Sequence, residues 1–149
     1  MVMLTKHFSV DQLCVSEIAD KYKIDNRPSP FVLANLVRLA ELLEEVQALL
    51  GKPIEICSGY RSRRLGLLVG DKGYCTHGWG LAADFICPTF ASPLAVCRAI
   101  AISKLEWDQL IYEFNWVHIS VVEYRRYKSK RPRRHIGTVN ENVRHMGLP

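Results

Sequence analysis

Apolar residues follow helical spacing over one long stretch of the chain. Ser29-Pro30 places an N-cap residue directly before a proline at the first helical position. Apolar residues then recur every three or four positions until Gly51: Phe31, Leu33, Leu36, Val37, Ala40, Leu43, Val46 and Leu50. The spacing predicts an amphipathic helix over residues 30–50 whose apolar stripe packs into the core.

Two shorter helices have similar start signals. Ser9-Val-Asp-Gln12 has the form of a capping box and predicts a short helix that continues to about Asp20. Ser92-Pro93 opens another helix, which runs to about Ser103 and carries the apolar residues Leu94, Val96, Cys97, Ile100 and Ala101.

Compact apolar or alternating runs predict four strands, over residues 54–58, 81–86, 109–113 and 116–122. The last two are joined at Phe114-Asn115 and read as a hairpin, while residues 62–76 read as a loop with a short helical turn. Helices placed before and between antiparallel strands predict an α+β fold, with an antiparallel sheet and helices packed on one of its faces.

Length and composition predict one soluble domain over residues 1–149. No run approaches the roughly 20 apolar residues of a membrane span. The first residues lack a basic region followed by an apolar one, so we expect no signal peptide and synthesis in the cytoplasm. The five cysteines are odd in number and include no CxxC pair, which favours reduced thiols over a disulfide framework.

The net charge of +5 comes from one segment. Residues 125–135 hold seven Lys and Arg residues and no acidic residue, whereas the rest of the chain is slightly acidic. A solvated loop explains this segment, and so does a patch that binds an anionic cell-wall polymer. Tyr124 and Tyr127 lie among the arginines, but the acidic body and the lack of a known nucleic-acid motif argue against a nucleic-acid partner.

Strand alternation gathers candidate metal ligands. Val117, Ile119 and Val121 share one strand face, so His118 points to the other. In the strand before it, Asp84 lies on the face opposite bulky Leu81 and Phe85, beside small Ala82 and close to Gly80. An aspartate within an apolar strand is costly unless it is paired or binds a metal.

His77, Asp84 and His118 together form a ligand set with two nitrogens and one oxygen. Such a set leaves a coordination position for water, which is typical of catalytic rather than structural zinc. Each residue alone is explained as well by ordinary hydrogen bonding. The three together, with small residues between two of them, favour a zinc site.

The motif His77-x-x-Gly80-x-Ala82-x-Asp84, preceded by Ser58-Gly-Tyr-Arg61-Ser and followed by Trp116-x-His118, resembles the zinc D-alanyl-D-alanine carboxypeptidase family. This family is related to the vancomycin-resistance D,D-dipeptidases, the phage L-alanyl-D-glutamate endolysins and the hedgehog signalling domain. The resemblance extends from Phe8 to about Val122. It implies an α+β zinc peptidase that cleaves cell-wall peptides containing D-amino acids.

The resemblance also implies roles for single residues. His77, Asp84 and His118 would bind zinc, and Arg61 would contact the substrate carbonyl and the developing oxyanion. A surface position is the alternative for Arg61. Relatives often carry the general base three residues before the last histidine, a position that Asn115 occupies here. We therefore expect Glu113 to be the base, with Asp108 as the second candidate.

Three further residues are expected to bind substrate. Cys75 stands where relatives often carry serine; its thiol would weaken a substrate hydrogen bond or compete as a soft zinc ligand. Trp79 and Trp116 would line the cleft, although core packing explains either one equally well.

Three functions remain open from the sequence. A carboxypeptidase removing terminal D-alanine is the first expectation, and an L-alanyl-D-glutamate or cross-bridge endopeptidase is the second. The third is a zinc-containing cell-wall binding module without activity, which Asn115 favours. Action on peptidoglycan without an export signal fits a phage or mobile-element enzyme released by another protein, or cytoplasmic processing of wall fragments. We expect a monomer.

Overall fold

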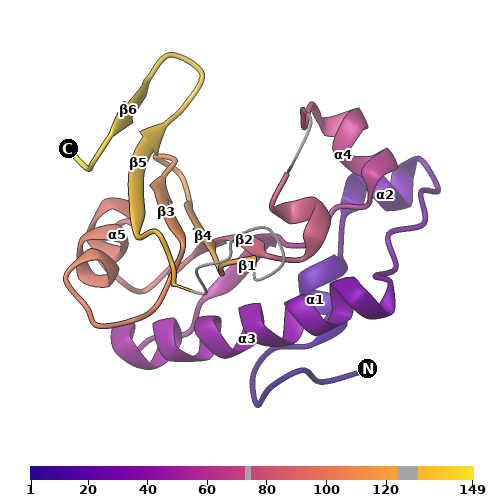
Figure 1. Cartoon of the computed structure of the whole chain (residues 1–149), viewed down its shortest axis with the longest axis horizontal. Helices are drawn as coiled ribbons and strands as arrows, with labels where there is room; N and C mark the ends of the chain where they lie inside the picture. The colour runs from indigo at the N-terminus through magenta and orange to yellow at the C-terminus, as the bar shows by residue number, and fades with distance from the viewer. Residues whose placement is uncertain (73–74, 124–130) are drawn as a thin grey trace.

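A six-stranded sheet, covered on one face by two helices, forms the body of the protein (Figure 1). The structure is a computed structural model that describes residues 1–72, 75–123 and 131–149. The strand order is β1-β2-β4-β3-β5-β6. The α+β class predicted from the sequence is confirmed.

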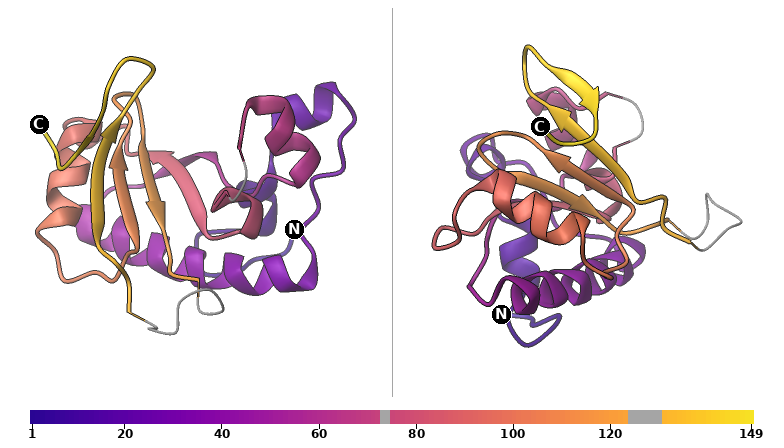
Figure 2. Two further views of the ribbon diagram at one scale, coloured as in Figure 1. Left: turned by 45° about the horizontal axis from the view of Figure 1, so that its top comes forward. Right: turned by 90° about the vertical axis from the view of Figure 1, so that its left-hand side faces the viewer.

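The two long helices begin where their capping residues predict, and the second of them ends two residues before the predicted Ser103. α3 spans Pro30–Leu50; the Ser29 side chain accepts a hydrogen bond from the Val32 amide, and Gly51 ends the helix with φ 65°. α5 spans Pro93–Ala101 behind the corresponding Ser92 cap. Both helices pack on the same side of the sheet, and their apolar residues join those of the strands in one core (Figure 2).

The predicted N-terminal helix is in fact two short helices. α1 spans Val10–Cys14 and has the predicted capping box at Ser9, whereas α2 spans Glu17–Lys21. Val15 between them is extended, and the Ser16 hydroxyl accepts a hydrogen bond from the Ala19 amide. Ser16 therefore caps a second helix and does not continue the first.

The four predicted strands are present as β1 (Glu55–Ser58), β2 (Ala82–Ile86), β3 (Gln109–Tyr112) and β4 (Val117–Ser120). β3 and β4 form the predicted hairpin, closed by a hydrogen bond from the Glu113 amide to the Trp116 carbonyl. Each neighbouring pair in the series β1-β2-β4-β3 is antiparallel.

Three further elements lie in segments for which the sequence predicted no strand and, within residues 62–76, only a short helical turn. α4 (Arg63–Val69) occupies half of the predicted loop. β5 (His135–Val139) and β6 (Arg144–Met146) extend the sheet at its C-terminal edge. Because β5 runs parallel to β3, the sheet is antiparallel except for this one pair among its described strands.

The basic segment leads into β5. Residues 125–130 lie outside the described part of the chain, so the predicted polymer patch is untested there. Arg133 donates several hydrogen bonds to the buried carboxylate of Asp108. Arg134 donates to the Leu105 carbonyl and lies over the Trp107 ring. These two cations therefore attach β5 to the fold.

Gly80 connects a 3-10 turn, η1 (His77–Trp79), to β2 and should be sensitive to substitution. It has φ 70°, and a Cβ atom there would lie 2.8 Å from Val32 Cγ1 and 3.0 Å from the Val32 carbonyl oxygen. Gly80→Ala should lower the free energy of unfolding by the left-handed cost of about 1–2 kcal/mol plus about 1–3 kcal/mol for overpacking. Urea denaturation measures this change.

Gly70→Ala is the matched control, because Gly70 also has positive φ but no atom lies within 4 Å of the position that an added Cβ atom would take. Its free energy of unfolding should fall only by the left-handed cost, without the cost of overpacking. Equal losses in the two variants would contradict the close packing of Gly80 on α3.

Candidate metal centre

Asp84 and His118 lie side by side on neighbouring strands. The two residues are direct partners in the antiparallel register of β2 and β4, and Ser58 of β1 is the partner of Asp84 on the other side. His118 Nδ1 lies 3.0 Å from Asp84 Oδ1. As strand alternation predicts, both side chains project from the face opposite the helix-covered core.

His77 reaches the same carboxylate from η1. Its Nδ1 lies 2.8 Å from the Gly59 carbonyl oxygen, which can only accept, so Nδ1 carries a proton. In the neutral ring, Nε2 then carries no proton and has a free lone pair. Nε2 lies 3.4 Å from Asp84 Oδ1. A lone pair facing a carboxylate is favourable only if a proton or a cation lies between the two.

The spacing of the three groups fits one metal ion. Ligand atoms of His77, Asp84 and His118 all lie within 4.8 Å of one another. Atoms bound tetrahedrally to zinc at about 2.0–2.1 Å are separated by about 3.3 Å, close to the two distances from Asp84 Oδ1. His118 Nε2 is buried and has no hydrogen-bond partner among the described residues, so Asp84 is the group that orients this ring. The residues fit a zinc ion.

Asp84 is the negative centre of the site. Burial by itself would raise the pKa of this carboxyl, but its interactions with His118 and His77 outweigh burial and hold the pKa far below its usual range. Asp84 is therefore an ionised carboxylate, the form that binds a metal.

Arg61 lies beside the candidate metal ligands and is held by several groups. Its Nη1 donates to Ser58 Oγ at 2.9 Å and lies 4.0 Å from Asp84 Oδ2. Its amide donates to the His77 carbonyl at 3.2 Å, while His77 donates to Gly59. Burial would lower the pKa of the guanidinium, but the hydrogen bonds to Asp71 outweigh this and raise it. Arg61 is a fixed cation at the metal site.

Glu113 directly follows β3 and borders the same cleft. Its strand neighbour Ile111 is the register partner of His118, and alternation puts Glu113 on that face. Trp116 Nε1 donates to Glu113 Oε2. Burial, followed by repulsion from Asp84, raises the pKa of the carboxyl above its ordinary value. The structure thus brings the predicted base to the metal site.

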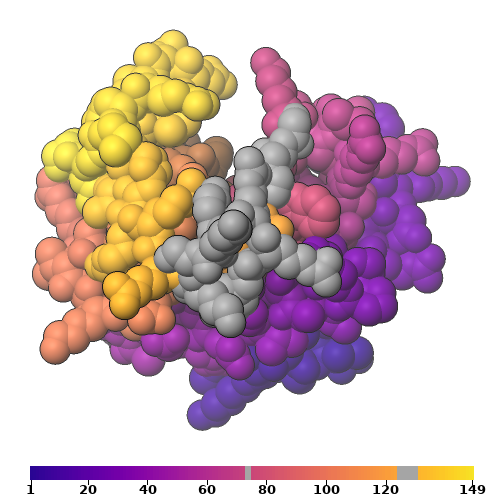
Figure 3. Space-filling view, in the orientation of Figure 1, coloured from indigo at the N-terminus to yellow at the C-terminus, as the bar shows by residue number. Residues whose placement is uncertain are grey.

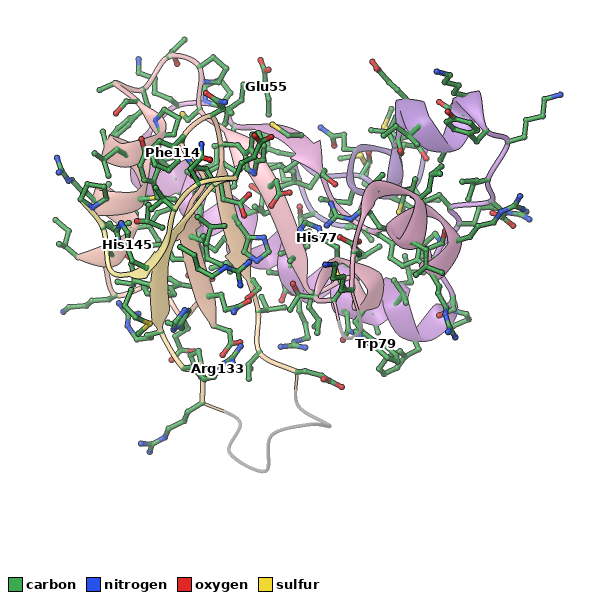
Figure 4. All side chains as sticks on the ribbon, turned by 90° about the horizontal axis from the view of Figure 1, so that it is seen from above. Glu55, His77, Trp79, Phe114, Arg133 and His145 are labelled. Atoms are coloured by element: carbon green, nitrogen blue, oxygen red, sulfur yellow. The ribbon has the colours of Figure 1, made fainter. Side chains whose placement is uncertain are left out.

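The cleft that contains these groups has a volume of about 590 Å³. One wall comes from Arg61, Lys72 and residues 75–77, and the other from β3 and the nearby residues Glu113, Trp116 and Arg133, with Asp84 and His118 between them. Figure 3 shows the hollow between α4 and the β5–β6 end of the sheet, and Figure 4 looks down onto it.

Of the four other predicted site residues, two border the cleft and two do not. Cys75 and Trp116 border the cleft, and Cys75 is not a member of the ligand group. Trp79 borders an adjacent groove that shares Arg61 and Cys75, and it contacts the Phe31 ring edge-on. Asp108 is 2% exposed and bound to Arg133, and its place next to Gln109 puts it on the other strand face. It does not border the cleft.

Sequence reasoning missed several residues of this site. Lys72, Gln109 and Ile111 border the cleft, as does Arg133. The alternation that placed Glu113 on the cleft face would also have found Gln109 and Ile111. Asp71, which binds Arg61, follows α4 in the segment predicted as a loop with a short helical turn, and no motif singled it out.

An α+β fold that gathers two histidines, an aspartate, an arginine and a glutamate in one cleft is the arrangement expected of a metal-dependent hydrolase. The Peptidase M15 family model matches residues 6–120, which is most of the chain. The chain belongs to this family, and it is a metallopeptidase. A search of curated proteins finds no match. In the part of the chain that the structure describes, no helix is long and apolar enough to cross a membrane.

Proposed function

We propose that this protein is a zinc-dependent peptidase that hydrolyses peptidoglycan peptides containing D-amino acids, and that it removes terminal D-alanine as a carboxypeptidase. The observation that carries the proposal is the convergence of His77, Asp84 and His118 on one point, with Arg61 and Glu113 beside it. Membership in the Peptidase M15 family supports the same chemistry.

The residues of the cleft suit amide hydrolysis. His77, Asp84 and His118 would hold zinc, which when bound polarises a carbonyl and makes water more acidic. Glu113 takes a proton from the attacking water and passes it to the leaving nitrogen as the C–N bond breaks. Arg61 donates to the carbonyl oxygen as negative charge develops on it. The products are a carboxylate and an amine.

Cations on both walls support an acidic substrate. Arg61 and Lys72 border the cleft on one side and Arg133 on the other. A peptide that ends in a carboxylate matches this charge. The presence of Glu113 in the cleft disfavours the alternative of a zinc-containing wall-binding module without activity.

An endopeptidase is the second candidate, because the cleft does not end at Arg61 and Cys75. Both residues also border the adjacent groove that contains Trp79 and Leu67. A peptide that continues past the scissile bond would have room there. The test is a digest of purified muropeptides by zinc-loaded protein, followed by mass spectrometry.

Loss of one terminal alanine from pentapeptide stems would support the carboxypeptidase, and cleavage within the stem or cross-bridge would support the endopeptidase. An intact digest at full zinc occupancy would contradict both. The same digest with Glu113→Gln protein controls for contaminating hydrolases.

A further inference from the structure

Asp71 binds the guanidinium of Arg61 through both carboxylate oxygens. Arg61 Nε lies 2.8 Å from Asp71 Oδ2, and Nη2 lies 3.1 Å from Oδ1. The side chains are only 17% and 21% exposed. A two-point contact of this kind fixes the plane of a guanidinium as well as its position. Asp71 therefore determines where Arg61 points.

The backbone after α4 is shaped to deliver this carboxylate. Gly70 ends the helix with φ 94°, and the Asp71 amide then turns back to donate to the Gly66 carbonyl at 2.8 Å. A Cβ atom on Gly66 would lie 2.9 Å from Asp71 Oδ2. The absence of a side chain at Gly66 leaves the space that the carboxylate occupies.

Arg61 has a second carboxylate within reach. Its Nη1 lies 4.0 Å from Asp84 Oδ2. A largely buried arginine that loses its partner moves towards the nearest available charge, because an unpaired buried charge is costly. That charge is on Asp84, the carboxylate of the ligand group.

We infer that Asp71 is a positioning residue that holds Arg61 towards the substrate carbonyl and away from the metal ligand Asp84. The inference rests on the proposed function, in which Arg61 contacts the scissile carbonyl. Asp71 does not border the metal cleft itself, so its effect passes through Arg61. Two measurements, zinc affinity and turnover, should respond to its loss.

A double-mutant cycle on turnover tests the coupling. Arg61→Ala should lower kcat by about 10²- to 10³-fold, the loss seen when one oxyanion donor is removed. Asp71→Ala should cause most of this fall in kcat with little change in KM. Asp71→Asn keeps one hydrogen-bond acceptor and should cause a smaller fall in kcat. In the Arg61→Ala background, Asp71→Ala should change nothing further. An equal loss in both backgrounds would overturn the inference.

Zinc affinity gives an independent measurement that needs no substrate. In chelator competition, Asp71→Ala should weaken zinc binding by about 10- to 100-fold, as removal of groups around metal ligands does, because Arg61 then competes for Asp84. Asp71→Ala in the Arg61→Ala background should bind zinc as tightly as Arg61→Ala alone. Unchanged affinity in the single variant would show that Asp71 does not keep Arg61 from Asp84.

Two further variants separate positioning from stability. Gly66→Ala should displace the Asp71 carboxylate and lower kcat, while alanine favours the helical conformation and keeps the melting temperature. Asp25→Asn is the matched control, because Asp25 pairs with Arg27 in the same way on the exposed surface. It should leave kcat and zinc affinity unchanged. If the parent hydrolyses no muropeptide but the zinc affinities of the Asp71 and Arg61 variants change as expected, the proposed substrate is wrong and the role of Asp71 stands.

Discussion

Glu113→Gln should lower kcat by about 10²- to 10⁴-fold, the usual contribution of a general base, while zinc stays bound at one ion per chain. The amide keeps the size of the side chain and its contact with Trp116, but it cannot take a proton from water. The measurement is the initial rate of muropeptide hydrolysis together with metal analysis of the same sample. Glu45→Gln, at an exposed carboxylate on α3, is the control and should leave the rate unchanged.

The pH dependence gives the same assignment a second test. Glu113 must be ionised to act as a base, so kcat/KM should fall as the pH falls through its pKa. Burial and Asp84 raise this pKa. The fall in kcat/KM should therefore lie at a higher pH than for an enzyme whose base is an ordinary glutamate with a pKa of about 4.3. The Trp116 hydrogen bond lowers the pKa, so Trp116→Phe should move the fall to still higher pH. An acid limb that persists in Glu113→Gln protein would assign it to another group.

His118→Ala should abolish zinc binding and reduce hydrolysis to the background rate. His118 supplies one of the three ligand atoms, and only His77 and Asp84 would remain. A second measurement is stability: excess zinc at 100 times its Kd should stabilise the parent by about 2.7 kcal/mol and the variant not at all.

His145→Ala is the control for the His118 variant, because His145 lies exposed on β6 (Figure 4). It should bind zinc and hydrolyse substrate as the parent does. A chelator should inactivate the parent, and added zinc should restore it. Hydrolysis by zinc-free His118→Ala protein would refute the metal-dependent mechanism.

The parts of the fold that the sequence predicts are those determined by local chemistry. The Ser29 and Ser92 caps and the apolar stripe of α3 depend on neighbouring residues, and they appear where expected. Strand alternation likewise placed Asp84 and His118 on the cleft face. Glu113 was expected at the end of its strand, and the hairpin brings it into the cleft.

The parts that the sequence does not predict depend on contacts between distant segments. β5 follows a run of basic residues without a strand pattern, and it pairs with β3 while Arg133 binds buried Asp108. The same contact removes Asp108 as a candidate base. Trp79 was expected in the metal cleft, but its contact with Phe31 on α3 places it beside the adjacent groove.

The reciprocal hydrogen bonds between residues 59–61 and His77 have a consequence for substrate selection. Arg61 donates its amide to the His77 carbonyl, and the His77 ring donates to the Gly59 carbonyl, so the two side chains share one rigid frame. The frame is itself fixed, because the Tyr60 amide donates to the Leu13 carbonyl of α1. These hydrogen bonds therefore hold Arg61 and His77 at a fixed separation. We therefore expect the site to accept only an amide whose carbonyl oxygen lies within reach of both Arg61 and an ion held by His77.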